Sequence, residues 1–273
     1  MSPPPLVFVT GASSGIGQAL ARCYVARGWR VALVARRVDE MRDWVRAQGW
    51  SMAGVDAASA GPGPLGQVAV YAADVRVDAE IHAAAARCLA TQGLPDVVIA
   101  NAGISVGIDL RHAQDLPVLR DLFETNVLGL AATFQPFIEP MVARGRGCLV
   151  GVACVAAARG LPGHAGYCGS KAAVVQMCET LRGELAPSGV KVVTLTPGYV
   201  ATPLTQHNDY PMPFLMSPEA FAARAVRAID RGARFTVIPW PMGVVWAVLR
   251  ALPRGWFDAI VGAQTHRKKR RRP

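Results

Sequence analysis

The sequence has few charged residues and no hydrophobic run long enough to cross a membrane. Lys, Arg, Asp and Glu make up 18% of its 273 residues, whereas about 25% is typical of soluble domains. The apolar stretch 242–252 near the carboxyl end is shorter than the ~18 residues of a spanning helix, and Arg250 interrupts it. We therefore expect one large, rather apolar domain with a full core.

Paired cysteine spacings are also missing. The six cysteines, at positions 23, 88, 148, 154, 168 and 178, form no CxxC pair and no zinc-type spacing. We interpret them as free thiols in a reducing compartment, and expect a cytoplasmic protein without a bound metal. No basic segment precedes the first apolar run, so no secretory leader is expected.

Positive charge is in excess, but it is unevenly placed. The formal net charge is +10, and six of these charges lie in the tail 267–272, Arg-Lys-Lys-Arg-Arg-Arg. The basicity is therefore largely a terminal feature and says little about the folded body. Because no other basic patch accompanies the tail, we do not expect nucleic-acid binding.

Short apolar runs alternate with longer helical stretches. The expected strands are 6–10, 30–35, 68–73, 96–100, 148–152, 190–196 and 235–238. The expected helices lie near 15–28, 38–48, 77–92, 117–143, 164–186 and 217–231, and 54–66 is an expected loop. Continuous apolar strands between helices indicate a single-domain α/β fold: a doubly wound, Rossmann-type parallel sheet with helices on both faces. Ligands then bind at the carboxyl ends of the strands.

A glycine-rich segment, TGASSGIG at 10–17, follows the first strand and opens the first helix. Glycines permit a tight turn and close approach of the backbone to a pyrophosphate, whose charge the helix amino terminus favours. We expect a dinucleotide to contact Gly11, Ser13, Ser14, Gly15, Ile16 and Gly17.

The next two strand ends suggest which dinucleotide binds. The second strand ends in Ala35, followed by Arg36 and Arg37 in place of a carboxylate. Two guanidinium groups suit a ribose 2′-phosphate, which favours NADP(H) over NAD(H), although a solvated basic turn has the same sequence. After the third strand, Asp74, with Val75 beside it, is placed to accept a hydrogen bond from adenine. After the fourth, Asn101, Ala102 and Gly103 let the chain pass close to the cofactor.

Tyr167 and Lys171 lie four residues apart and project from one face of an expected helix. A free tyrosine has a pKa of about 10, too high for acid–base work near neutrality. We expect Lys171, together with a positive nicotinamide ring, to lower the pKa of Tyr167. Tyr167 then exchanges a proton with a carbonyl or alcohol oxygen while the cofactor carries the hydride.

These segments, in this order, resemble the short-chain dehydrogenase/reductase family to about residue 240. The resemblance rests on TGASSGIG at 10–17, NAG at 101–103, Asn126, YCGSK at 167–171 and PGYVAT at 197–202. It implies that Asn126 holds a water linking Lys171 to solvent. It further implies that Pro197, Gly198, Val200 and Thr202 line the nicotinamide site, with Thr202 on the carboxamide. It implies a homodimer or homotetramer built on the helices at 117–143 and 164–186.

One family residue is replaced. The family places a serine thirteen residues before the tyrosine, and this chain has Cys154 there. A thiol is a weaker hydrogen-bond donor than a hydroxyl, and loss of such a donor costs up to about 10²–10³ in rate. We expect a slow but active enzyme. Two alternatives stay open: an inactive, NADPH-binding sensor or interaction protein, and a site with altered chemistry.

The substrate side is expected to come from 104–109, 155–166 and 199–217. The run 210–216, Tyr-Pro-Met-Pro-Phe-Leu-Met, suits a lid over a hydrophobic carbonyl compound or secondary alcohol, and equally an oligomer contact. A carrier-linked ketoacyl group is a narrower option.

The extension 241–273 lies beyond the expected domain, 1–240. It combines Trp246, Trp256, Phe257 and aliphatic residues with the basic tail. Such a combination fits peripheral anchoring on an anionic membrane. It equally fits a helix that packs between subunits.

Overall fold

The computed structural model describes residues 3–52 and 68–262. Its core is a seven-stranded sheet in the order β3-β2-β1-β4-β5-β6-β7, with every pair parallel. The strands are β1 Leu6–Thr10, β2 Arg30–Ala35, β3 Val68–Ala72, β4 Val97–Ala100, β5 Gly147–Val152, β6 Val190–Pro197 and β7 Phe235–Ile238. All seven predicted strands are confirmed to within one residue at each end, and so is the doubly wound α/β fold.

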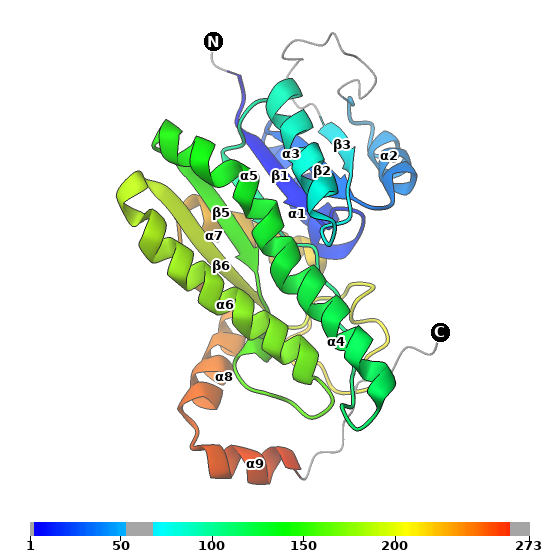
Figure 1. Cartoon of the computed structure of the whole chain (residues 1–273), viewed down its shortest axis with the longest axis vertical. Helices are drawn as coiled ribbons and strands as arrows, with labels where there is room; N and C mark the ends of the chain where they lie inside the picture. Colours follow the sequence, from blue (N-terminus) through cyan, green and yellow to red (C-terminus); the bar gives the residue numbers. More distant parts are fainter. Residues whose placement is uncertain (1–2, 53–67, 263–273) are drawn as a thin grey trace.

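Helices cover both faces of this sheet (Figure 1). On one face lie α1 Gly15–Ala26, α2 Val38–Ala47 and α7 Pro218–Asp230; on the other lie α3 Asp78–Thr91, α5 Gly129–Arg144 and α6 Ala165–Leu185. Alternate residues of each strand face opposite sides, so Val7 and Val9 join the first core while Leu6 and Phe8 join the second. Two apolar cores, one on each face, therefore pack the helices against the sheet and keep the ends of its strands in place.

The expected helix at 117–143 is divided. It consists of α4 Leu116–Phe123, a π-helical turn Glu124–Leu128 and α5. The wider turn carries Asn126, whose amide exchanges hydrogen bonds with the backbone of Ile104. A π turn inserts a residue into the helix and re-aims its side chains, which no helical periodicity in the sequence reveals.

Two further helices, α8 Trp240–Ala251 and α9 Arg254–Gly262, follow β7. They lie at the opposite end of the molecule from the amino terminus (Figure 1). α8 packs on β7, where the rings of Phe235 and Trp246 are 5.2 Å apart. Within the described ranges, no helix is both long and apolar enough to span a bilayer. The predicted loop 54–66 and the tail 267–272 lie outside the described residues.

Candidate active site

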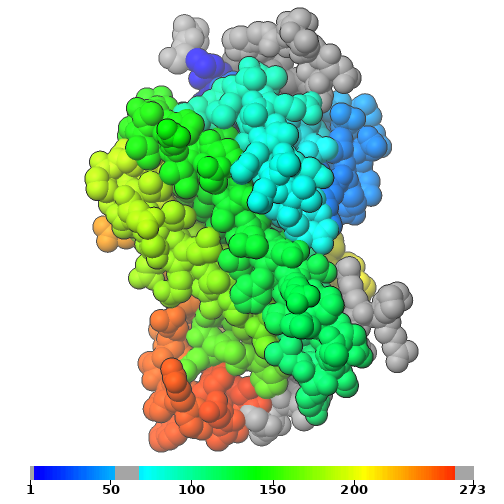
Figure 2. All heavy atoms as spheres, in the orientation of Figure 1, coloured from blue at the N-terminus to red at the C-terminus, as the bar shows by residue number. Residues whose placement is uncertain are grey.

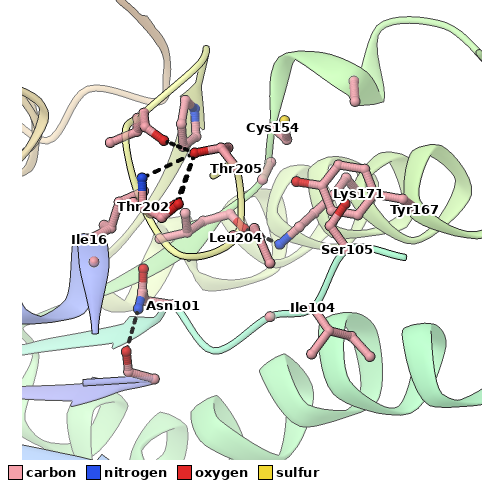
Figure 3. A pocket seen from close by; sticks show the side chains of 18 of the residues that line it. Ile16, Asn101, Ile104, Ser105, Cys154, Tyr167, Lys171, Thr202, Leu204 and Thr205 are labelled. Carbon is pink, nitrogen blue, oxygen red and sulfur yellow. Dashed lines mark hydrogen bonds between the residues drawn. The ribbon is translucent and has the colours of Figure 1, made fainter. Parts of the chain in front are cut away.

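A cavity of about 1230 Å³ opens at the carboxyl ends of the central strands. It is lined by Cys154, Tyr167 and Lys171 and by the residues expected to bind a dinucleotide, except Gly17. Asn126 does not line it either, but lies against Gly103, which does. Figure 3 shows Ile16 and Asn101 toward one end and Cys154, Tyr167 and Lys171 toward the other. Segments far apart in the sequence therefore meet at one site, in the place expected for this fold.

Close backbone packing shapes the glycine-rich turn after β1. Gly11 has φ +65°, and a Cβ there would lie 2.7 Å from the Ala102 Cα. A Cβ on Gly17 would lie 2.3 Å from the Gly11 carbonyl oxygen. Asn101 Nδ2 donates to the carbonyl oxygens of Thr10 and Gly11, at 3.0 and 3.1 Å. Only glycine fits the first two positions, so the turn keeps an open, backbone-lined cradle of the kind that a pyrophosphate needs.

The cradle also contacts the segment after β6. Gly15 has φ +56°, and a Cβ there would lie 2.9 Å from Thr202 Cγ2. Thr205 Oγ1 donates to the Val200 carbonyl oxygen at 2.6 Å and accepts from the Thr202 backbone N–H at 3.1 Å. Thr202 is therefore held beside the cradle, where it was predicted to meet the nicotinamide end.

Two arginines stand at the end of β2. Arg37 donates to Ser13 Oγ in the cradle at 3.3 Å and pairs with Glu40 at 3.0 Å. Arg36 lies 3.8 Å from an Asp74 carboxylate oxygen, and both arginines line the cavity. Their positive charge beside the open backbone cradle fits a dinucleotide that carries an extra phosphate on its ribose.

Asp74 is more firmly paired than the sequence indicated. Arg76 binds its carboxylate through the guanidinium, at 2.8 Å, and through the backbone N–H, at 3.0 Å. These hydrogen bonds hold the pKa of Asp74 below its usual range. Asp74 thus remains an ionised acceptor, but it shares its oxygens with Arg76.

Lys171 is almost completely buried, with 5% of its surface exposed. Burial lowers the pKa of its ammonium group to about 8. The ammonium donates to the Val152 carbonyl oxygen at 2.9 Å. A Cβ on Gly103 would lie 3.1 Å from Asn126 Oδ1 and 3.3 Å from Lys171 Nζ, so the two side chains converge there.

Asn126 organises the backbone behind the site. Its Oδ1 accepts from the Ile104 N–H at 2.8 Å, and its Nδ2 donates to the Ile104 carbonyl at 3.0 Å and to Ser170 Oγ at 2.9 Å. The sequence did not predict this clamp on the segment that follows Gly103. The role of Asn126 as a water holder stays a prediction.

The acidity of Tyr167 differs from what we expected. Burial, followed by the nearby Cys154, raises the pKa of Tyr167 above its ordinary value. Lys171 donates its ammonium hydrogen bond to the Val152 carbonyl oxygen, while Cys154 shares a hydrogen bond with the tyrosine. Burial therefore outweighs the lowering expected from Lys171, and the raised pKa favours the neutral, proton-donating phenol of Tyr167.

Cys154 lies two residues after the end of β5, where the chain enters a short 3₁₀ turn, and it is half-buried. Its thiol faces the cavity beside the Tyr167 ring (Figure 3). The structure thus places the cysteine next to the tyrosine. That it takes the place of a catalytic serine stays a prediction.

The far end of the cavity is apolar. Each predicted substrate segment contributes, for example through Ile104, Leu161 and Tyr210. His164 precedes α6 at its N-cap position, without a capping hydrogen bond from its side chain. Its Nδ1 lies 3.0 Å from the Pro162 carbonyl oxygen, and its ring stands edge-on to Tyr210. The sequence missed the fourth wall, which is one face of α8: Met242, Val245, Trp246 and Leu249. Their helical spacing was the available signal, but it does not say what the face covers.

An arginine from the 155–166 segment ties down this wall. Arg159 Nε donates to the Leu249 carbonyl oxygen at 2.7 Å, and its Nη2 donates to the Leu252 carbonyl oxygen. Its guanidinium also lies over the Phe257 ring, 5.1 Å from the centroid. Arg159 thereby satisfies carbonyls left unpaired at the end of α8 and links α8, α9 and the substrate segment.

The sequence pattern of the short chain dehydrogenase family matches residues 5–211. The chain belongs to this family of oxidoreductases. It is 37% identical over 258 residues to an uncharacterized oxidoreductase of Myxococcus xanthus, covering 92% of this chain and 94% of that one. It is 30% identical over 203 residues to the 2-(R)-hydroxypropyl-CoM dehydrogenase of Xanthobacter autotrophicus, covering 74% and 76%.

Solved short-chain dehydrogenases have the same fold. One from Streptomyces avermitilis is 28% identical, with a TM-score of 0.73 and 94% of each chain covered. Another, from Burkholderia cenocepacia in complex with NADP, is 23% identical, with a TM-score of 0.76 and coverage of 96% and 99%. The second likeness shows the fold alone. For this short-chain dehydrogenase, α8 and α9 lie beyond the stretch that the family pattern matches.

Proposed function

We propose that this protein is an NADP(H)-dependent oxidoreductase that interconverts a carbonyl and an alcohol on a hydrophobic substrate. One observation carries the proposal. A single cavity holds a backbone cradle with two arginines at one end and Tyr167, Lys171 and Cys154 before an apolar chamber at the other. A dinucleotide laid along the cavity brings its reactive end to the tyrosine.

Residues of the chain bind and orient the cofactor. The backbone around Gly11 and Gly15 receives the pyrophosphate, and Arg36 and Arg37 grip the ribose phosphate. Thr202, held by Thr205, contacts the nicotinamide carboxamide. Bound NADPH supplies a hydride, or NADP⁺ accepts one.

Proton transfer falls to Tyr167. It starts as a neutral phenol and donates its proton to the carbonyl oxygen of the substrate. The positive charge of Lys171 stabilises the resulting phenolate, and Asn126 with its water returns a proton from solvent. In alcohol oxidation the same proton moves in the opposite direction.

Cys154 sets the rate in this account. It stands where a hydroxyl would donate to the substrate oxygen, and its thiol donates more weakly. The enzyme is therefore slow but active. The apolar walls from Tyr210 to Trp246 select a hydrophobic carbonyl compound or secondary alcohol.

We also propose a homodimer or homotetramer in the cytoplasm. Phe123 and Leu128 are exposed on the first of the two helical stretches expected to form the interface, 117–143. The six cysteines are free, which suits a reducing compartment. Light scattering of the purified protein measures its mass, and a monomer at micromolar concentration contradicts the assembly.

Cofactor titration tests the proposal at its first step. Binding of NADPH and NADH to the purified protein is measured by calorimetry. We expect NADPH to bind at least about tenfold more tightly, and the Arg36→Ala/Arg37→Ala variant to lose that preference. The Arg42→Ala/Arg46→Ala variant, which alters two α2 arginines outside the cavity lining, serves as the matched control and keeps the preference. Equal affinities of the wild type for NADPH and NADH would contradict the assignment of NADP(H) as the cofactor.

A further inference from the structure

The helix α8 has two apolar faces, and the cavity explains only one. Met242, Trp246 and Leu249 face the cavity. On the opposite side Trp240, Val244 and Val248 are 76%, 55% and 58% exposed. These three lie four residues apart, so they form one continuous outward stripe. A continuous exposed stripe of aromatic and aliphatic side chains along a helix is typical of an interaction surface.

The next helix extends this surface. On α9 Trp256 and Ile260, again four residues apart, are 70% and 54% exposed. Phe257, between them, is instead buried beneath the Arg159 guanidinium. Figure 2 shows α8 and α9, in orange and red, as a lobe at one end of the molecule. Because Arg159 fixes both helices, the two stripes are presented by an ordered lobe.

Charge accompanies the two stripes. Residues 240–273 contain eight Lys and Arg residues and one acidic residue, Asp258. Arg250 and Arg254 are exposed on the lobe itself. The chain continues past the end of α9 at Gly262 and reaches the cationic run 267–272 five residues later. The sequence that follows the apolar lobe is therefore strongly cationic.

We propose that the outward stripes of α8 and α9 dock on an anionic lipid surface, with the cationic run on the headgroups. Tryptophans beside arginines are suited to the interface between headgroups and acyl chains. Anionic lipid attracts each nearby cation, and the attraction falls off within a Debye length. A second copy of this chain fits less well, because a symmetric contact between these lobes would bring two surfaces that carry Arg250 and Arg254 together.

Vesicle flotation of the full-length protein tests this docking. The vesicles are phosphatidylcholine alone, or phosphatidylcholine with about 30% phosphatidylserine. We expect binding to the anionic vesicles, weak binding to the neutral ones, and release of most of the protein in about 0.5 M salt. The Val244→Glu/Val248→Glu variant should bind at least about tenfold more weakly. The matched control, Val77→Glu, alters a 43%-exposed valine just before α3, away from the proposed oligomer interface, and should bind like the wild type.

Each result has a defined meaning, and none depends on turnover. Equal flotation of the wild type and the stripe variant overturns the proposal. The proposal is also overturned if the stripe variant binds vesicles like the wild type but has a different oligomeric mass. The stripe would then join two copies of the chain. If the stripe variant fails to fold, flotation is repeated with a full-length variant in which all six residues of 267–272 are replaced by Gln. Unchanged binding of that variant to anionic vesicles overturns the proposal.

Discussion

The two ends of the cavity are built in different ways. At the dinucleotide end the contacts are largely backbone: Gly11 and Gly17 leave room for neighbouring chain, and Asn101 bonds two carbonyls. At the substrate end the walls are apolar side chains from segments as far apart as Ile104, Tyr210 and Trp246. The first end admits almost no substitution, whereas the second is free to vary in shape. Substitutions can test this contrast from either end.

The largest effect is expected where the two ends meet. Replacing Tyr167 by Phe removes the proton donor and leaves the ring in place. We expect turnover to fall by about 10²–10⁴, with NADPH affinity changed less than about twofold. Stopped-flow hydride transfer and calorimetric titration measure the two quantities. Turnover that survives in Tyr167→Phe would assign the proton to another group.

Replacing Lys171 should raise the stability of the folded protein, although it removes activity. Its pKa falls from 10.5 to about 8 in the folded protein. The unfolded chain therefore binds more protons between these values, and wild-type stability should rise with pH across this window. Lys171→Met should stabilise the protein at pH 7 by up to about 3 kcal/mol while abolishing turnover.

Urea unfolding at pH 7 and at pH 10 measures this difference. The gain of Lys171→Met over the wild type should shrink at the higher pH, because the wild-type lysine is then neutral. Lys191→Met, at an exposed lysine on β6, is the matched control and should show no such change. A variant less stable than the wild type at pH 7 would show that the buried ammonium is stabilising.

The backbone cradle can be tested with two glycines of similar conformation. Gly11 and Gly28 both have positive φ, +65° and +75°, but a Cβ meets Ala102 at the first and nothing within 4 Å at the second. Gly28→Ala should cost about 1–2 kcal/mol of backbone strain. Gly11→Ala should cost more and weaken NADPH binding as well. Equal losses of stability in thermal unfolding, with equal NADPH affinity, would contradict the close approach of Gly11 to Ala102.

The substrate wall should give the smallest effect. Trp246→Leu enlarges the chamber, and we expect kcat/KM for preferred apolar substrates to fall by about tenfold. NADPH affinity should not change. Trp240→Leu, the same substitution on the outward face of α8, is the control and should leave kcat/KM unchanged with water-soluble substrates. Equal effects of the two substitutions would remove α8 from the substrate site.

The sequence predicted the sheet, the glycine turn and the placing of Tyr167 and Lys171 on one helix, because each depends on local chemistry. A buried strand is a short apolar run, and a cradle needs glycines at fixed spacing. The sequence did not predict the division between α4 and α5, because a π turn leaves no periodic signal. The sequence also did not predict that α8 lines the cavity, because an apolar helix face does not show which surface it packs against.

The acidity of Tyr167 escaped for a related reason. The four-residue spacing correctly placed Tyr167 and Lys171 on one helix, but it did not show that the ammonium is directed at Val152. Nor did it give the burial that raises the pKa of the tyrosine. Electrostatic effects depend on distances and on surrounding solvent, which are set by tertiary packing.

The central claim is that the protein is an active oxidoreductase whose rate is limited by Cys154. Steady-state oxidation of NADPH by the wild type and by Cys154→Ser, over a panel of apolar ketones and aldehydes, tests it most directly. The account predicts measurable turnover of at least one carbonyl by the wild type, and faster turnover by the serine variant, by up to about 10²–10³. A serine variant that binds NADPH and reduces no substrate faster than the wild type would contradict it.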